Sequence, residues 1–302
     1  MAHQAWQIHS AKIGTNVLPH VAGQAIEMQI EEELAANAGD LFPRQRYVWR
    51  AGLSAELRSH AIYTILGKLD LDDLTPGMDL ATAANNLLLT VGQRKYRAEG
   101  FETTAISYLL DRGYGYLRSL SADERGICSL VLDAISTSAN GTVAGYTRSA
   151  VASLQTLPTA AELYRVSSIV VGSQNLAHWS GFDWSCEANV QAIAEPKDLY
   201  ATQVMVAPDG LIEHTLTIQS EELTKVFAET SALGKEVTTV ITMQSLSKAG
   251  VLGGAVAQVT LTHRGTMAPS SPRGDAQGRA TDTFTSRGRI DGTTYPTTIA
   301  LT

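Results

Sequence analysis

The chain has 302 residues, a formal net charge of −7 and a hydrophobic fraction of 44%. This composition suffices for a packed core and excludes general disorder, and the acidic balance excludes the basic surface with which proteins grip nucleic acid. No apolar run approaches the length of a membrane-spanning helix, the N-terminus does not read as a signal peptide, and Cys128 and Cys186 predict neither a disulfide framework nor a zinc site. We therefore expect a reducing cytoplasm, or a particle assembled there.

The first half of the chain carries weak secondary-structure signals. Leu87–Val91 and Cys128–Ala134 predict strands, whereas Ala105–Asp111 fits a helix or a strand. Residues 68–79 are acidic and suggest a calcium loop. Such a loop needs glycine in the sixth of its twelve places, where this chain has Thr75 when the loop is counted from Asp70, so we expect a solvated acidic loop without a bound ion.

The second half is β-like in most places. Small polar residues and Pro158 place the boundary between the halves within 149–163. Beyond it, β-branched residues alternate with polar ones in five predicted strands: Ile169–Val171, Gln203–Val206, Leu211–Ile218, Val237–Met243 and Val256–Thr262.

An internal repeat links the two halves. Shifted by 158 positions, residues 18–53 lie on residues 176–211 without a gap, and ten of the 36 positions are identical. Chance would give about two or three identities in one register. The repeat predicts a gene duplication; the alternative is two unrelated β-rich halves. Equivalent structural positions are then Gly23 with Gly181, Asp40 with Asp198, and Gly52 with Gly210.

Each copy is expected to continue into one helix. Ser54 and Ser220 are the expected N-caps, because a serine hydroxyl accepts hydrogen bonds from the first free N–H groups. Acidic residues follow each serine, where the helix dipole favours them. Gly67 and Gly234 are expected to close the helices in a left-handed conformation.

Turn and loop signals complete the pattern. Asn140-Gly141 and Asp291-Gly292 are the dipeptides favoured in two-residue hairpins. Residues 268–279 hold two prolines and two glycines, and we interpret them as a flexible loop or as an arm that folds against a neighbouring chain. The candidate contact residues of this loop are Pro269, Pro272, Arg273, Gly274, Asp275 and Arg279.

No catalytic constellation is recognisable. The glycine-rich residues 250–254 are followed by Ala255 instead of the lysine of a phosphate loop, and the G-x-S-x-G and H-E-x-x-H patterns are missing. The sequence therefore predicts no enzyme, no cofactor and no metal site. The alternative is a cytosolic enzyme or binder of two β-rich lobes, which would carry a polar pocket with perturbed titratable groups, for example at the seam between the copies.

The predicted elements follow one order in the chain. A strand runs into Gly23, a long loop follows, and the stretch 42–48 leads into a short helix. Strands that end at an Asn-Gly or Asp-Gly turn come next, and residues 290–296 form the C-terminal part of this layout. This layout resembles the tail tube proteins, also called major tail proteins, of long-tailed bacteriophages. The resemblance extends over most of both copies.

The resemblance implies a mainly β fold with a few short helices (α+β). It implies two tandem tail-tube-like β-sandwich domains, residues 1–155 and 156–302, whose inner sheets close into a ring β-barrel on oligomerisation. In the branch of the family with two such domains per chain, three chains make a pseudo-hexameric ring. Rings stack into a tube, locked by long loops such as the one at residues 268–279.

The resemblance also implies the partners and the location. This would be a structural virion protein of the viral tail, assembled in the host cytoplasm and contacting copies of itself and other tail proteins at the tube ends. Double-stranded DNA would pass through the lumen during ejection without specific binding, and no membrane would be involved. An acidic, lysine-poor chain suits such a conduit, because each cationic contact would hold the phosphates. The alternatives within the virion are a tail terminator, a head–tail joining protein or a capsid decoration protein, which usually have a single tube-like domain.

Overall fold

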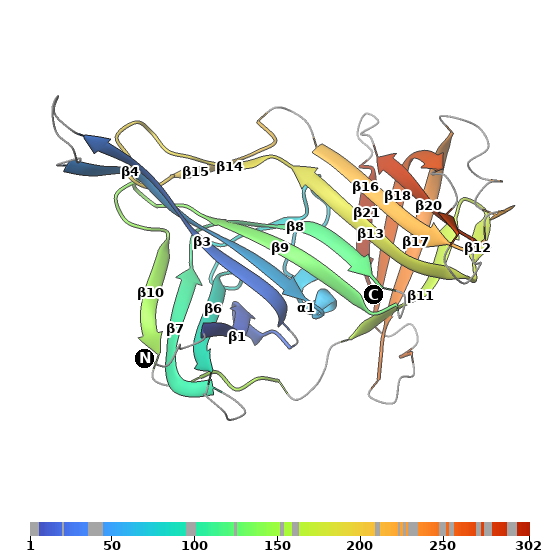
Figure 1. Cartoon of the computed structure of the whole chain (residues 1–302), viewed down its shortest axis with the longest axis horizontal. Coiled ribbons are helices and arrows are strands. Elements are labelled where there is room, and N and C mark those ends of the chain that lie inside the picture. The colour runs from blue at the N-terminus through green and yellow to red at the C-terminus, as the bar shows by residue number, and fades with distance from the viewer. Residues whose placement is uncertain are drawn as a thin grey trace.

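A computed structural model describes residues 6–19, 21–35, 45–94, 101–123, 126–151, 154–158, 163–208, 212–222, 224–225, 228, 235–247, 252–253, 257–269, 273–274, 280–288 and 295–302. Within these residues the protein is mainly β, as predicted, and every pair of named strands is antiparallel. None of the helices in the described part of the chain is long and apolar enough to cross a membrane. Figure 1 shows two groups of strands side by side.

The first half of the chain builds two sheets and a short helix, α1 (Ile62–Leu66). One sheet has five strands in the order β10-β7-β6-β1-β2, and the other strands follow the order β8-β9-β4-β3. β5 pairs with the edge of β8. The strands are β1 (Trp6–Ile13), β2 (Asn16–Val17), β3 (Val21–Ala35), β4 (Gln45–Ser59), β5 (Gly77–Asp79), β6 (Leu87–Arg94), β7 (Phe101–Leu110), β8 (Gly113–Ala122), β9 (Cys128–Ser136) and β10 (Tyr146–Val151).

The second half repeats this arrangement with one long strand, β18, in the places of both β7 and β8. Its order is β12-β11-β17-β18-β20-β16-β13, with β21 beside β18 and β19 beside β20. The strands are β11 (Tyr164–Val171), β12 (Gln174–Leu176), β13 (Trp179–Ala188), β14 (Val190–Ile193), β15 (Gln203–Val206), β16 (Ile212–Ser220), β17 (Glu236–Ser245), β18 (Gln258–Pro269), β19 (Arg273–Gly274), β20 (Ala280–Gly288) and β21 (Thr297–Leu301).

The pairing registers of the two halves agree residue by residue at their starts. Adding 158 to each partner of the β1–β2 pairs reproduces the β11–β12 pairs, so that Ile13↔Asn16 corresponds to Val171↔Gln174. A β-bulge interrupts β1 after Ile8 and β11 after Val166, which is the same position of the repeat. Within the described residues the repeat therefore extends back to Trp6, upstream of the stretch in which sequence identity is visible.

The hairpins that follow show the same agreement. Between β3 and β4 the pairs run from Glu32↔Val48 to Ala35↔Gln45, and the β14–β15 pairs are these pairs shifted by 158. A second shared bulge lies just before Gly23 in β3 and just before Gly181 in β13. Since bulges are specific local features, their recurrence supports the duplication that the sequence predicts.

The equivalence of Gly52 with Gly210 is wrong. Gly52 pairs with Gln29, and the pair at the same place in the second half is Glu187↔Glu213, so Glu213 is the counterpart of Gly52. The reason is that five residues, 207–211, separate β15 from β16, whereas two residues of β4 separate the corresponding pairs. Gly210 lies within this insertion and outside the described residues.

The turn glycines Gly14 and Gly172 are equivalent and both have positive φ, 55° and 59°. A side chain at Gly14 would in addition overlap the carbonyl of Ala84. We expect Gly172→Ala to lower the free energy of unfolding by about 1 kcal/mol, from the left-handed backbone, and Gly14→Ala by at least twice as much. Urea unfolding of the two variants tests this, and equal losses would contradict the close approach at Ala84.

One hydrophobic core runs between the sheets. In the first half the buried residues alternate along the strands, as Leu53, Ala55 and Leu57 do in β4, and they belong to the same buried cluster as Leu87 and Leu89 of β6. The alternation places one face of each strand in the core and the other in solvent. The core therefore fixes which face of each half is exposed.

The predicted helix at Ser54 is wrong: β4 continues to Ser59, and Ser54 lies within it. The apolar spacing Leu57–Ala61–Ile65 suggested a helical period, but the buried alternation of β4 dominates up to Ser59. Ser59 Oγ, not Ser54, accepts a hydrogen bond from the backbone N–H of Ala61 at 3.1 Å. Gly67 does follow α1, but with φ −66° it is not left-handed.

The other local predictions had mixed outcomes. The ambiguous residues 105–111 belong to strand β7 up to Leu110. Asn140-Gly141 does not form a two-residue hairpin, because it lies in the longer connection from β9 to β10, strands of different sheets. Asp291-Gly292 lies outside the described residues.

Candidate assembly interface

The two halves are joined edge to edge through β8 and β13. Four antiparallel pairs, from Ser119↔Ser185 to Ala122↔Phe182, connect the last strand of one half to the first strand of the corresponding sheet in the other. The sheet thus runs without a break as β3-β4-β9-β8-β13-β16-β20-β18 (Figure 1). We call this pairing the joint. It is heterologous, because two different edges of the repeat meet in it.

Gly181 lies where the joint begins. A Cβ at this residue would lie 3.0 Å from the carbonyl oxygen of Ala122 in β8, tighter than nine in ten real Cβ contacts. Glycine is therefore the residue that lets β8 come alongside the bulge of β13. The equivalent residue in β3 is Gly23, so the repeat retains glycine at this position in both copies.

A second contact between the halves involves Asp198, a buried residue in the loop between β14 and β15. Gly141 faces it with positive φ, 74°, and has no room for a side chain beside the Asp198 carboxylate. The backbone N–H of Tyr200 donates to the Gly141 carbonyl at 2.9 Å, and that of Ala51 in β4 donates to Leu199 at 2.8 Å. The repeat residue Asp198 thus serves to pack one half on the other, while Asp40 lies outside the described residues.

The acidic residues 68–79 form a third contact. The predicted solvated loop is wrong in part, since Thr75 and Met78 are buried. The loop carboxylates accept backbone hydrogen bonds at short range, as Asp70 Oδ1 does from the N–H of Asp72 at 3.2 Å. At the other side of the loop, the Leu74 carbonyl accepts a hydrogen bond from His214 Nε2 of β16 at 2.8 Å. The loop therefore covers the second half next to the joint.

The two outer edges of the continuous sheet are open among the described residues. β3 is one end of the strand order, and its 15 residues pair with β4 and with no other described strand. At the other end, the edge of β18 from Met267 to Pro269 pairs with β20 on its inner side only. An open edge of this length is a template for pairing with another chain.

Burial differs between the open edge and the joint in a systematic way. The inward row of β13 contains Trp184 and Cys186, which are 0% and 1% exposed. The equivalent row of β3 contains Ile26, half-buried, and Met28, which is 50% exposed. Ile30, the next residue of the row, is 47% exposed. The same apolar row is therefore covered where a neighbouring half is present and uncovered where it is not.

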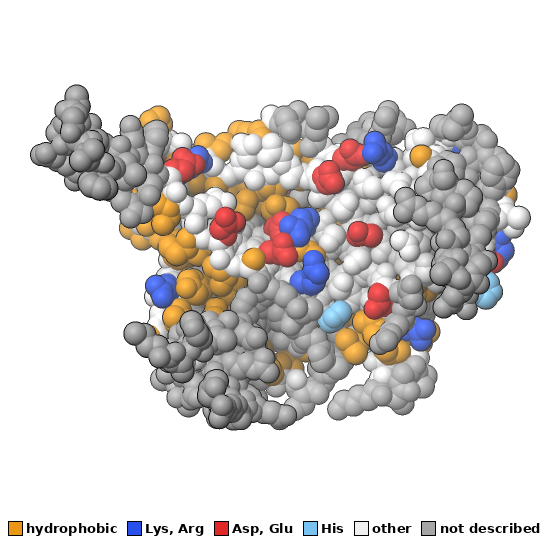
Figure 2. All heavy atoms as spheres, viewed as in Figure 1, with side chains coloured by type: hydrophobic (Ala, Val, Ile, Leu, Met, Phe, Trp, Pro, Cys, Tyr) orange, Lys and Arg blue, Asp and Glu red, His pale blue; other side chains and the backbone are white. Residues whose placement is uncertain are grey.

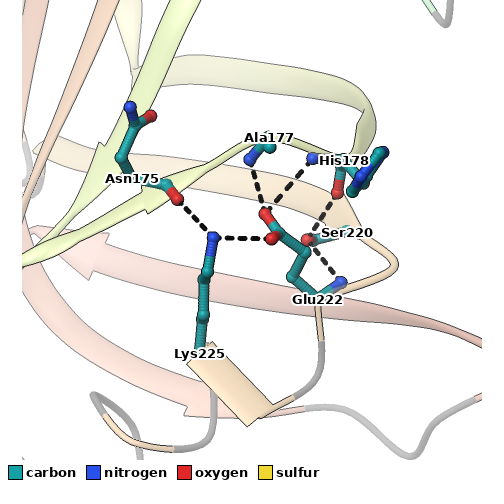
Figure 3. A network of polar contacts seen from close by, with 6 residues as sticks. All are labelled: Asn175, Ala177, His178, Ser220, Glu222 and Lys225. Atoms are coloured by element: carbon teal, nitrogen blue, oxygen red, sulfur yellow. Dashed lines mark hydrogen bonds and ion pairs between the residues drawn. The ribbon is translucent and has the colours of Figure 1, made fainter.

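Ser220 is the last residue of β16, so its predicted place as a helix N-cap is not confirmed, and it sits in a polar network (Figure 3). Its hydroxyl donates to the His178 carbonyl at 2.8 Å and accepts from the N–H of Glu222 at 3.0 Å. Glu222 Oε2 accepts from the backbone N–H groups of Ala177 and His178, and Lys225 Nζ lies 2.6 Å from Glu222 Oε1. The bond from Lys225, followed by these backbone bonds, lowers the pKa of Glu222. The network anchors the turn to the loop before β13, and Gly234 lies outside the described residues.

The candidate loop at residues 268–279 is in part strand. Pro269 ends β18, and Arg273 and Gly274 form β19 opposite Thr281 and Ala280 of β20. The prediction of a loop is wrong for these three residues, because an edge strand tolerates proline and glycine when a partner strand lies on its other side. Pro272, Asp275 and Arg279 lie outside the described residues.

The outward face of the continuous sheet carries carboxylates and arginines among polar side chains (Figure 2). We call it the polar face. Three of its arginines are paired with carboxylates: Arg50 with Glu31 at 3.5 Å, Arg118 with Glu56 at 2.7 Å and with Asp133 at 3.3 Å, and Arg287 with Glu213 at 3.2 Å. Arg58, exposed on the same face of β4 as Glu56, has no ion pair among the described residues. Glu27, Asp183 and Glu187 lie on the same face by register. Burial raises the pKa of Asp183.

A buried cysteine and histidine lie next to each other beneath the joint. Cys186 Sγ is 3.5 Å from His214 Nε2, but that nitrogen also faces the Leu74 carbonyl, which can only accept. Burial lowers the pKa of His214 to about 4 and raises the pKa of Cys186 to about 12. A neutral imidazole that donates its Nε2 proton cannot take the thiol proton, so this pair is not an activated nucleophile.

Ligand chemistry is sparse in the described part of the chain. No three His, Cys, Asp or Glu side chains lie close enough there to hold a metal ion. A shallow depression over the joint is lined by Ser121, Ser129 and Asp183, among others. The two serine hydroxyls bond each other at 3.2 Å, and no described hydrogen bond connects either to a histidine or carboxylate.

Comparisons with models of protein families and with curated proteins find no match for this chain.

Proposed function

We propose that this chain is a structural protein of a virion, the building block of a phage tail tube. In this proposal each half is a tail-tube-like β-sandwich domain, and chains assemble into rings that stack around a lumen. The observation that carries the proposal is the joint: one chain already contains two equivalent units joined head to tail in a single sheet.

A head-to-tail contact is the kind that generates rings or filaments. Heterologous interfaces repeat until the rotation closes into a ring, or continue as a helix when it does not. The chain contains one such step and presents the same two kinds of edge at its ends, β3 and β18. Three chains would supply six units to a closed ring.

The polar face supports the role of a DNA conduit. In a closed ring whose sandwiches lie outside, the outward face of the continuous sheet lines the lumen. Arg50, Arg118 and Arg287 are paired with carboxylates, which leaves Arg58 as an arginine of this face without a described ion pair. A lining with surplus carboxylates repels DNA, so the genome slides without the salt-dependent hold that cationic contacts create.

The rival functions are less well supported by the site. An enzyme of two lobes would place a nucleophile, a base or a metal at the seam, but the depression there has serines bonded to each other, and the buried Cys186–His214 pair is inert. Tail terminators, head–tail joining proteins and decoration proteins share the β-rich composition. The repeated units in one chain favour the tube over these single-unit components.

Negative-stain electron microscopy of the purified chain tests the proposal. We expect rings or stacked tubes with a central hole, and native mass spectrometry should give whole rings of three chains. Retention of a monomer at concentrations of about 100 μM, with no rings in the images, would contradict the proposal. Rings that bind duplex DNA tightly at low salt would contradict the role of a conduit.

A further inference from the structure

β18 and β19 of the second half together occupy the place of β8. In the first half, Ser121 and Ala122 of β8 pair with Ser129 and Cys128 of β9. In the second half, Arg273 and Gly274 of β19 pair with the corresponding residues of β20. The correspondence follows from two pairs at the same place of the repeat, Ser59↔Leu130 and Ser220↔Asp282. They make Leu130 of β9 the counterpart of Asp282 of β20. β19 is thus the counterpart of the part of β8 that makes the joint.

β3 occupies the place of β13 in the same way. The two strands share the bulge before the equivalent glycines, Gly23 and Gly181, and the same inward row of residues. Within the joint, Ser121 lies opposite Asp183 and Ala122 opposite Phe182. By the repeat, Asp183 corresponds to Ala25 and Phe182 to Gln24. Both halves of a second joint are therefore present in every chain, at opposite ends of its sheet.

We infer that β18 and β19 of one chain pair with β3 of a second copy of the chain, with Arg273 opposite Ala25 and Gly274 opposite Gln24. This inference rests on the head-to-tail assembly proposed above and assigns its contact surface. It also changes the role of the segment that the sequence marked as a lock between rings: Arg273 and Gly274 belong to the lateral contact within a ring.

Two features of β3 indicate that the chain pairing with its open edge is a second copy of this chain. The first is Gly23, because the equivalent Gly181 is glycine to admit the Ala122 carbonyl, and Gly274 stands in the place of Ala122. The second is the uncovered inward row, since Met28 is 50% exposed where its counterpart Cys186 is 1% exposed. A joint like the internal one would cover this row.

The test is disulfide cross-linking at Ala25 and Arg273, with the internal joint as the matched control. The equivalent pair within the chain is Asp183 and Ser121, so the S121C/D183C variant reports whether this register brings two cysteines into bonding distance. Burial raises the pKa of both native thiols, of Cys186 to about 12, so they do not compete.

Under mild oxidation we expect S121C/D183C to form a bond within the chain. We expect A25C/R273C to form bonds between chains that give a covalent ladder ending at one closed species on non-reducing gels. The single variants A25C and R273C should remain uncross-linked. A G23V variant should fold with unchanged cooperativity but lose the rings.

The outcomes separate this inference from the proposed function. If rings form and S121C/D183C closes, but A25C/R273C stays unlinked, the lateral contact uses other surfaces and the inference is wrong while the ring stands. If A25C/R273C links chains but no tubes stack, the contact is correct and the tail-tube role fails. Rings that persist in G23V would also overturn the contact.

Discussion

Replacing Trp184 by alanine is expected to lower the free energy of unfolding by about 4 kcal/mol, the range found for removing a large buried aromatic side chain. Trp184 is fully buried and lies opposite Leu120 of β8 in the joint and opposite Leu216 of β16. Its ring stands edge-on to His214 at 5.5 Å, and its Nε1–H donates to Thr297 Oγ1 at 3.1 Å. The Trp184 side chain therefore connects the joint to β16 and to Thr297 within the second half.

The repeat supplies the control for this experiment. Ile26 holds the equivalent place on the open edge and is half-buried, so Ile26→Ala should cost about 1 kcal/mol in the isolated chain. Trp184→Phe keeps the ring contact and loses the hydrogen bond, at a cost of about 1–2 kcal/mol. Chemical unfolding in dilute protein measures all three, because assembly then makes no contribution. Equal losses for Trp184→Ala and Ile26→Ala would mean that the joint is not a packed part of the fold.

The strands of the second half could be predicted because their signal is local. Gln203–Val206 was predicted with the bounds that β15 has, and Val237–Met243 lies within β17. In β17 the buried residues alternate with more exposed ones, which is the pattern that β-branched sequences produce when one face of a strand meets a core. Such alternation can be read without knowing which strands pair.

The repeat was visible only where identities survived. Between Trp6 and Gly14 the halves share Ser10 with Ser168 and Gly14 with Gly172, and the other positions except Lys12, opposite Val170 in the repeat, keep their hydrophobic or polar type instead of their identity. The ungapped comparison then failed at Gly52, because it passed through the insertion before β16. Identity marks positions where backbone geometry requires one residue, whereas the core accepts any side chain of suitable size.

The joint itself could not be predicted from the sequence. Its facing residues, among them Ser119, Ser121 and Ser185, are ordinary for a solvent-facing strand. What distinguishes them is which edges meet, and edge pairing depends on the tertiary arrangement of two sheets far apart in sequence. Gly23 and Gly181 were found as repeat positions, but their role depends on the approach of the Ala122 carbonyl, which appears only in the fold.

Acidification from pH 7.5 to pH 5 is expected to lower the free energy of unfolding by about 4 kcal/mol, because two buried histidines must stay neutral in the fold. Burial lowers the pKa of His214 to about 4, and burial together with the neighbouring His214 lowers the pKa of His263 to about 4. In the unfolded chain both titrate near 6.5. Between these values the unfolded state binds protons that the folded state does not, so stability is complete above about pH 6.5 and is lost as the pH falls toward 4.

Two substitutions isolate this effect while keeping the hydrogen bonds. His214 uses Nε2 toward the Leu74 carbonyl, which a glutamine amide can replace, and His263 uses Nδ1 toward Thr297 Oγ1 at 2.9 Å, which an asparagine amide can replace. H214Q and H263N should each remove about 2 kcal/mol of the loss between pH 7.5 and 5, measured by urea unfolding in dilute protein. Asp133 and Asp183 have raised pKa values and therefore act in the opposite direction, at lower pH. A pH slope that is unchanged in both variants would show that these imidazoles are not held neutral beneath the joint.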